Sequence, residues 1–151
     1  MRHTRNYRSK VGNLGIICDD DYLIGLEINE TIEETDRDYP LLLEIERWLD
    51  DYFLGKKMSV EGLPIKLIGS EFQKKVWTIL LNIPYGQTMH YGQIAKMIDP
   101  KMSAQAVGTA VGHNPIGIIV PCHRVLGKNN LGGFASGMEI KMILLKLEGI
   151  I

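Results

Sequence analysis

The chain contains little cysteine and no long apolar run. Only Cys18 and Cys122 occur among 151 residues. Two cysteines make no disulfide framework, so we expect a protein of the reducing cytoplasm. No cysteine–histidine spacing typical of zinc sites is present, and we predict neither a metal site nor a cofactor. No apolar stretch reaches membrane-spanning length and no N-terminal signal segment is visible, so we expect no membrane partner.

Charge is distributed unevenly along a chain whose composition is that of a globular protein. The apolar content is 45% and the mean hydropathy −0.02. Residues 1–69 contain 9 Lys and Arg against 14 Asp and Glu, whereas residues 70–151 contain 8 against 4. An acidic half joined to a basic half suggests that only the second half meets a polyanion, although chance variation in surface charge explains such a modest excess equally well. We predict two domains, 1–69 and 70–151.

The first half predicts a small antiparallel sheet with one helix, in an α/β (α+β) protein. We expect Met1–Lys10 to be a loose end, Asn29–Tyr39 a loop, Pro40–Phe53 a core-facing helix, and Leu14–Cys18, Leu23–Ile28 and Ile65–Ile68 short strands. His3 and Cys18 have no partners at a meaningful spacing. We therefore interpret both as structural or surface residues, and this half as a supporting domain.

The second half predicts several short helices. Ser70 and Gln73 form a capping box, and the pattern of Met138–Leu147 is that of a helix buried on one face. Between them, helices Tyr91–Ile98 and Ala104–Val111 are separated by a tight break, with Gly112 as the expected C-cap. This pattern fits a helix-turn-helix, and an ordinary helical hairpin fits it equally well.

The stretch Asn114–Val125, which reads NPIGIIVPCHRV, is the most informative in the chain. The β-branched run Ile118–Val120 predicts a buried strand that ends at Pro121. The strand would deliver Cys122, a soft nucleophile, beside His123. Adjacent side chains of an extended strand point to opposite faces, so the pair requires a turn after Pro121 or a water molecule between them. Taken alone, Cys122 could equally be a buried apolar filler.

This stretch resembles the active-site signature of the O6-alkylguanine-DNA alkyltransferases, also called methylated-DNA–protein-cysteine methyltransferases. The signature is an Asn-Pro, a short apolar run and Pro-Cys-His-Arg-Val, and the resemblance extends over roughly residues 70–149. It implies a DNA repair protein that flips O6-alkylguanine out of duplex DNA. The alkyl group would pass irreversibly to Cys122 in a single turnover. The expected partner is double-stranded DNA carrying O6-alkylguanine, bound by a monomer.

The resemblance also assigns roles to individual residues. His123 would act as the base through a water molecule, and Glu148 would orient it and stabilise its cation, as in other catalytic triads. Tyr91 would offer its hydroxyl to the departing guanine, and Asn114 would be a hinge. Four residues would form the substrate pocket: Val111 and Phe134 as walls, Val125 through its carbonyl, and Ala135 through its backbone N–H.

The helix Ala104–Val111 would enter the DNA minor groove, for which its small side chains are suited. We expect DNA contacts from Ser103, Ala104, Gln105, Ala106, Gly108 and Arg124, with Arg124 also anchoring the active-site turn. The family places at position 105 an arginine that inserts into the base stack. Gln105 departs from that pattern, which predicts a weakened intercalating role or an altered substrate preference.

Two other functions fit part of the pattern. A Cys-His-Glu hydrolase would form an acyl-enzyme and would turn over repeatedly. A non-catalytic DNA-binding module that senses lesions is the second alternative, but the binders of this kind among the family's relatives lack the cysteine. Turnover separates the hydrolase from the single-use reagent.

Overall fold

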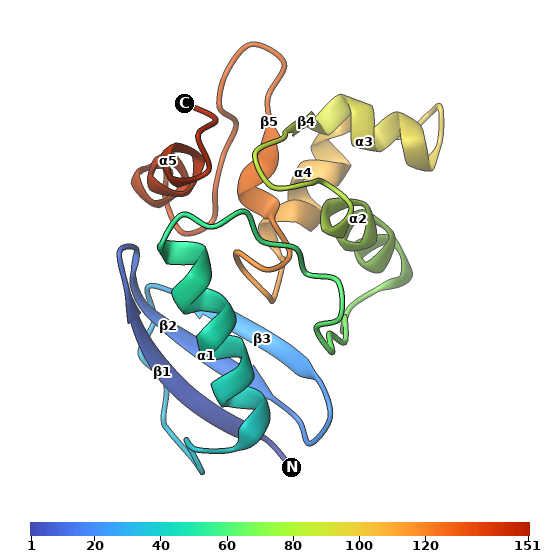
Figure 1. Ribbon diagram of the computed structural model, residues 1–151. Coiled ribbons are helices and arrows are strands. Elements are labelled where there is room, and N and C mark those ends of the chain that lie inside the picture. The colour runs from blue at the N-terminus through green and yellow to red at the C-terminus, as the bar shows by residue number, and fades with distance from the viewer.

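A computed structural model describes all residues 1–151 and divides the chain into a sheet with one helix and a helical part (Figure 1). The elements are β1 His3–Ser9, β2 Gly12–Cys18, β3 Leu23–Ile28, α1 Pro40–Phe53, α2 Glu71–Leu81, β4 Met89–His90, α3 Tyr91–Ile98, α4 Ala104–Gly112, the 3-10 turn η1 Cys122–Arg124, β5 Val125–Leu126 and α5 Met138–Leu147. The predicted mixed α/β class is confirmed.

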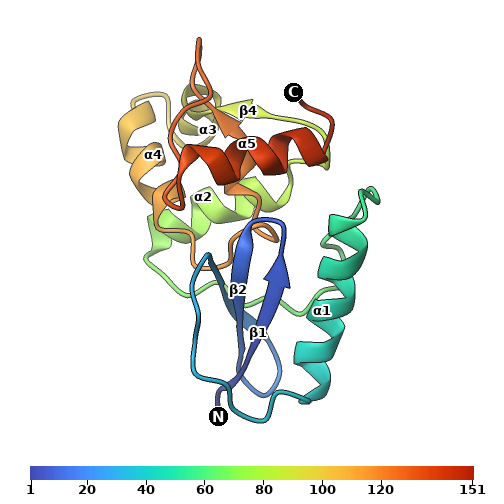
Figure 2. The same ribbon diagram turned by 90° about the vertical axis from the view of Figure 1, so that its left-hand side faces the viewer.

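The antiparallel sheet β1-β2-β3 packs one face against α1 (Figure 2). The buried residues of β2 alternate, with Leu14, Ile16 and Cys18 inaccessible to solvent. The buried stripe of α1 includes Leu42, Ile45 and Leu49 at helical spacing. The period of two in the strand and near 3.6 in the helix bring these apolar faces together. The helices α2 to α5 lie at the other end of the molecule in both views.

The helical part is tied together by α2. Ser70 and Gln73 form the expected reciprocal capping box at its start. The indole of Trp77 then donates to the carbonyl of Ala110 at 2.8 Å, so α2 fixes the position of α4. The two helices of the predicted helix-turn-helix, α3 and α4, are both present. Gly112 is the last residue of α4, so the C-cap is His113 and not the expected Gly112.

Three predictions of local structure were wrong. Most of the expected loose end is β1, because its backbone pairs along the whole of β2. The range Ile65–Ile68 forms only one isolated bridge, between Ile65 and Leu23. The run Ile118–Val120 is buried but folds into tight turns, with the Val120 N–H donating to the Ile116 carbonyl at 3.0 Å. Burial explains its composition, and a β-branched run does not by itself require a strand.

A single apolar core runs through both parts of the chain and includes Leu14, Leu49, Trp77 and Cys122. The cysteine therefore sits against the core rather than on a surface loop. None of the helices combines the length and the apolar character that crossing a membrane requires.

Candidate active site

The turn η1 carries three consecutive site residues. Cys122, His123 and Arg124 are each less than a tenth exposed. The Cys122 N–H donates to the Val120 carbonyl at 2.8 Å, and the Arg124 N–H donates to the Pro121 carbonyl at 3.0 Å. A 3-10 turn has three residues per turn and separates adjacent side chains by roughly 120°, whereas a strand separates them by roughly 180°. Of the two alternatives that the sequence left open, a turn after Pro121 or a water molecule between the side chains, the turn is present.

Asn114 closes the loop that leads into η1. Its side-chain amide donates to the Val120 carbonyl at 2.7 Å, and its side-chain oxygen accepts the Ile116 N–H at 3.0 Å. Within this loop Ile118 has φ +69°, a left-handed conformation that is costly for a β-branched residue. The two Asn114 bonds and the burial of the loop hold this strained backbone in place, and with it the turn that presents Cys122.

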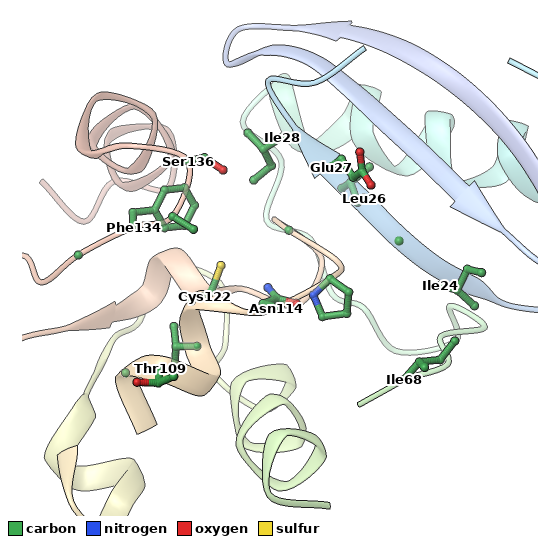
Figure 3. A pocket seen from close by; sticks show the side chains of 18 of the residues that line it. Ile24, Leu26, Glu27, Ile28, Ile68, Thr109, Asn114, Cys122, Phe134 and Ser136 are labelled. Atoms are coloured by element: carbon green, nitrogen blue, oxygen red, sulfur yellow. The ribbon is translucent and has the colours of Figure 1, made fainter. Parts of the chain in front are cut away.

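Cys122 opens into a pocket of about 910 Å³ between β3 and the helical part (Figure 3). The sulfur lies between Asn114 and Phe134 in this view. The structure brings to this pocket eight further residues predicted from the sequence: Tyr91, Ala104, Gln105, Gly108, Val111, Asn114, Phe134 and Ala135. Its far wall comes from the sheet and includes Ile24 and Ile28, which the sequence did not connect to the site.

The short parallel pair β4–β5 positions Tyr91 beside the chain that follows Cys122. Met89 pairs with Val125, and Tyr91 begins α3 directly afterwards. Gly132 has φ +72° and lies so close to Tyr91 that an added Cβ would stand 2.8 Å from the ring, so only glycine fits. The Tyr91 hydroxyl donates to the Gly133 carbonyl at 3.4 Å. A bond of this length is weak and leaves the hydroxyl free to turn toward another acceptor.

Lys141 is a fully buried cation that the sequence analysis missed. Its ammonium donates to the Val125 carbonyl at 2.7 Å and to the Gly133 carbonyl at 2.9 Å. It therefore joins the chain after Cys122 to the loop that carries Phe134. Burial lowers the pKa of Lys141 to about 8, and the neighbouring Cys122 acts in the opposite direction. Lys141 lies on the same face of α5 as the buried Leu144 and Leu145, and its spacing from these leucines is the only sequence signal that could have identified it.

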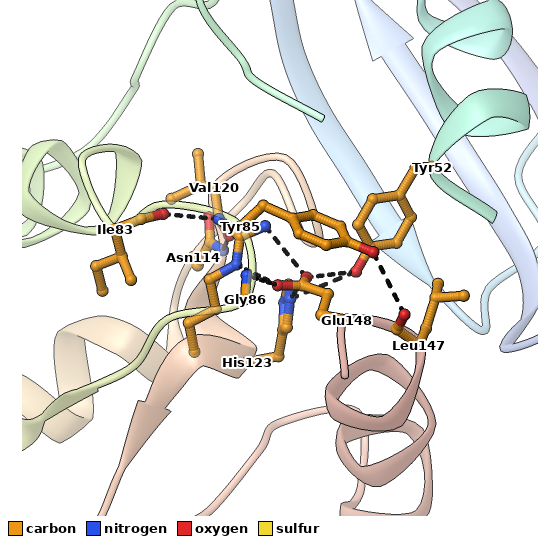
Figure 4. Close-up of polar contacts among 10 residues, drawn as sticks. Tyr52, Ile83, Tyr85, Gly86, Asn114, Val120, His123, Leu147 and Glu148 are labelled. Carbon is orange, nitrogen blue, oxygen red and sulfur yellow. Dashed lines mark hydrogen bonds and ion pairs between the residues drawn. The ribbon is translucent and has the colours of Figure 1, made fainter. Parts of the chain in front are cut away.

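Glu148, at the end of α5, collects five hydrogen-bond donors (Figure 4). Its Oε2 is 2.6 Å from His123 Nε2 and accepts the Tyr52 hydroxyl at 2.7 Å and Arg124 Nη2 at 3.1 Å. Its Oε1 accepts Arg124 Nε at 2.8 Å and the Gly86 N–H at 3.0 Å. These donors offset the unfavourable position of an acid at a helix C-terminus.

The charges in this cluster are set by opposing effects. Burial alone would raise the pKa of Glu148, but His123 and Arg124 lower it to about 2, so the carboxylate is ionised at neutral pH. Burial is the largest effect on His123 and lowers its pKa; Arg124 and Lys141 act in the same direction, against the Glu148 carboxylate, and the net shift is downward. A neutral His123 then donates from Nε2 to Glu148. Its Nδ1 is buried and has no hydrogen-bond partner within the chain, so it is the nitrogen that can accept a proton.

Cys122 is a thiol in the resting protein. Burial raises its pKa, while the Asn114 side chain and the Lys141 ammonium act in the opposite direction. A thiol is a poor nucleophile, so a reaction at Cys122 requires that its proton be removed. His123, next to it in the chain, has a buried nitrogen, Nδ1, that is free to accept a proton.

Two predicted site residues lie elsewhere than expected. Arg124 was expected to contact DNA, but its guanidinium is buried, binds Glu148 and donates to the Ile83 carbonyl at 2.7 Å. Because the planar guanidinium matches a carboxylate, this residue completes the cluster behind Cys122, in keeping with the expected anchoring role. Val125 does not line the pocket: its side chain is fully buried, and its carbonyl accepts Lys141.

The start of α4 forms the exposed rim of the pocket. Ser103 caps the helix by accepting the Ala106 N–H at 3.1 Å. Ala104 and Gln105 are exposed and line the pocket mouth, whereas Ala106 and Gly108 are half-buried. Gln105 is therefore exposed at the N-terminal end of α4, beside the cavity.

Tyr52 and His3 show what sequence spacing did not reveal. Tyr52 of α1 reaches Glu148 from 96 positions away, and nothing local in the sequence marks it. His3, whose partners were not visible in the sequence, is a buried residue: its Nδ1 is 2.5 Å from Asp36 Oδ2 and its Nε2 is 2.7 Å from Asp20 Oδ1. No group of three or more His, Cys, Asp or Glu side chains is placed so that it could hold a metal ion.

Comparisons with known proteins agree with this arrangement. The family model described as the 6-O-methylguanine DNA methyltransferase DNA-binding domain matches residues 71–150, which places the helical part among DNA-binding proteins. The model described as the ribonuclease-like domain of the same methyltransferases matches residues 3–67. The chain belongs to the 6-O-methylguanine DNA methyltransferase family, as the signature around Cys122 predicted.

Individual relatives are similar over most of the chain. The methylated-DNA–protein-cysteine methyltransferase of Mycobacterium leprae is 38% identical over 154 residues, covering 98% of this chain and 93% of the relative. That of Methanosarcina acetivorans is 53% identical over 109 residues, covering 70% and 68%. The crystal structure of the Mycobacterium tuberculosis O6-methylguanine methyltransferase has 40% identity and a TM-score of 0.85, covering 98% and 93%. The M. tuberculosis protein in complex with DNA gives 39% and 0.83, covering 97% and 92%.

Proposed function

We propose that this protein repairs DNA by moving the alkyl group of O6-alkylguanine to its own Cys122. One observation carries the assignment to Cys122. A buried thiol opens into the pocket, and the adjoining His123 has Nε2 on the Glu148 carboxylate while Nδ1 is unpartnered. The similarity to methylated-DNA–protein-cysteine methyltransferases supports the same reaction.

The reaction begins with removal of the Cys122 proton. His123 Nδ1 accepts it, directly or through a water molecule, and the ionised Glu148 stabilises the cation that forms. The thiolate attacks the alkyl carbon in line with its bond to O6. A sulfur–carbon bond forms as the carbon–oxygen bond breaks, and the bonding electrons leave with the guanine. The thioether is stable, so each molecule acts once.

The leaving guanine requires a hydrogen bond or a proton. Tyr91 lines the pocket, and burial raises its pKa, so its hydroxyl stays protonated and can donate. Ala135 also lines the pocket, and its backbone N–H is the donor proposed for O6. Phe134 and Val111 supply apolar walls for the base.

The target base must leave the duplex before it reaches Cys122, which costs a few kcal/mol. The exposed N-terminal end of α4 flanks the pocket, and Gln105 there is the residue proposed to enter the gap in the base stack. Small residues along α4, with Ala104 and Gly108 on the pocket side, would let the backbone approach the minor groove closely.

Intact-mass measurement after incubation with duplex DNA carrying O6-methylguanine tests the proposal. We expect one methyl group per protein molecule and no further turnover. Cys122→Ser should abolish the mass increase while DNA affinity stays nearly unchanged. Cys18→Ser is the matched control, because Cys18 is the other cysteine, is buried in the core and has a pKa that burial raises to about 11. Methylation of the Cys122→Ser protein, or repeated turnover by the unchanged protein, would remove Cys122 from this role.

A further inference from the structure

We infer that Tyr52 is a positioning residue for the transfer reaction, by which the N-terminal part of the chain aims the Glu148 carboxylate at His123. The inference rests on the proposed function of Cys122 and extends it, because it gives α1 a part in the chemistry and not only in the fold. The observation that carries it is the Tyr52 hydroxyl, which donates to Glu148 Oε2 at 2.7 Å.

Three donors share this one carboxylate oxygen and arrive from different parts of the chain. His123 and Arg124 come from η1, whereas Tyr52 comes from the last turn of α1. The tyrosine ring is fully buried and stacks on Trp48, with 5.4 Å between ring centroids. Its hydroxyl therefore has little freedom, and the position of Oε2 depends on how α1 is seated.

The Tyr52 hydroxyl remains a donor throughout the range in which the protein works. Burial raises the pKa of Tyr52, and the Glu148 carboxylate raises it further. A fixed donor has two consequences for Glu148: it holds Oε2 in line with His123 Nε2, and it satisfies part of the negative charge of that oxygen. Because the Tyr52 hydroxyl already binds this oxygen, Glu148 attracts a histidine cation less strongly. This helps His123 remain neutral and able to accept a proton.

The charged groups facing His123 determine how this would appear in a pH profile. They are Glu148 and Lys141 from α5 and Arg124 from η1, and of these Glu148 alone favours the histidine cation. Removing the Tyr52 hydroxyl leaves the two cations unchanged and strengthens the pull of Glu148. The acid limb of the transfer rate, where His123 becomes protonated, should then move to higher pH.

Tyr52→Phe tests the inference because it removes the hydroxyl and keeps the ring. We expect the single-turnover rate at saturating DNA to fall about tenfold near neutral pH, with less loss at high pH and unchanged DNA affinity. Tyr7→Phe is the matched control. Tyr7 also donates its hydroxyl to a carboxylate of α1, Asp50 Oδ1 at 2.6 Å, but makes no hydrogen bond to Glu148. An equal loss at every pH in Tyr52→Phe, or no loss, would overturn the inference.

A double-mutant cycle separates action through Glu148 from a general loosening of the fold. In a Glu148→Gln background, Tyr52→Phe should slow transfer by less than about twofold, because the carboxylate it positions is gone. A tenfold effect that persists in this background would contradict the inference, and urea midpoints of all variants would identify any loss of folding. If the unchanged protein gained no methyl group on Cys122, the proposed function itself would fail, which is a separate outcome.

Discussion

The molecule contains two buried histidines that each contact a carboxylate and lie near a tyrosine, and only one of them is suited to chemistry. His3 places both ring nitrogens on carboxylates, those of Asp20 and Asp36, and stacks on Tyr39 with 3.6 Å between centroids. His123 places one nitrogen on Glu148 and keeps the other unpartnered. A histidine with both nitrogens engaged can stabilise structure, whereas a base needs one free nitrogen.

The pKa values of the two histidines are shifted in opposite directions, in agreement with this difference. The hydrogen bond with Asp20 leads a set of contacts that raise the pKa of His3, and burial opposes them only in part. Burial dominates at His123 and lowers its pKa, so that histidine rests in the neutral form. The contacts of His3 therefore favour its cation, whereas His123 rests neutral and is free to accept a proton.

The largest expected effect comes from removing the carboxylate behind His123. Glu148→Gln should slow transfer about 100-fold or more, since the histidine cation loses its support. It should also lower the free energy of unfolding by about 3–5 kcal/mol, because Arg124 is left buried without an anion. Single-turnover kinetics at saturating DNA and urea denaturation measure the two effects separately.

The control is Glu139→Gln, which removes an exposed acid from the first turn of the same helix. It should leave both the transfer rate and the unfolding midpoint close to those of the unchanged protein. Transfer at the unchanged rate in Glu148→Gln would show that His123 needs no carboxylate, and the contrast with His3 would lose its meaning.

Sequence reasoning could propose a nucleophile and its neighbours because those residues form a contiguous string. Cys122, His123 and Asn114 lie within ten positions, and the helices around them follow clear apolar periods. The turn at η1 was one of two alternatives that the sequence left open, because two adjacent side chains on a strand point to opposite faces. The family resemblance supplied the long-range member, Glu148.

The parts that sequence reasoning missed depend on contacts made across the chain. Tyr52 meets Glu148, and Lys141 meets two backbone carbonyls, only after the core has formed. Burial of Arg124 likewise follows from the position of Ile83 and Glu148, which its place in the string does not indicate. The carboxylate partners of His3 were not visible in the sequence because they come from two different loops.

A smaller effect is expected from a change that touches neither histidine. Gln105→Arg introduces at the exposed end of α4 a planar cation that can stack, hydrogen-bond and attract phosphate. We expect the transfer rate on duplex DNA to rise roughly three- to tenfold, with a smaller gain on single strands, where there is less stack to fill. The test compares the transfer rates of Gln105→Arg and of the unchanged protein on duplex and on single-stranded DNA. An equal gain on single strands would show that position 105 does not enter the stack.

The smallest effect on transfer, and the sharpest test of the contrast, is expected at the other histidine. His3→Gln should leave the transfer rate unchanged because His3 lies at the start of β1, outside the Cys122 pocket. It should instead lower stability, in a way that depends on pH. Urea midpoints at pH 5.5 and pH 8.5, with His113→Gln as the control for an exposed histidine, measure this dependence.

The direction follows from the shifts of the pKa values. Because the pKa of His3 is raised in the folded protein, its contribution to stability is complete below the unfolded value of about 6.5 and is lost as pH rises through the folded value. The pKa of Asp20 is lowered, chiefly by its bond with His3, so that part is lost as pH falls below about 4. The stability difference between the unchanged protein and His3→Gln should therefore be greater at pH 5.5 than at pH 8.5. A difference that grows toward pH 8.5, or a slower transfer rate, would show that His3 is not a purely structural cation and that the two histidines are more alike than their contacts indicate.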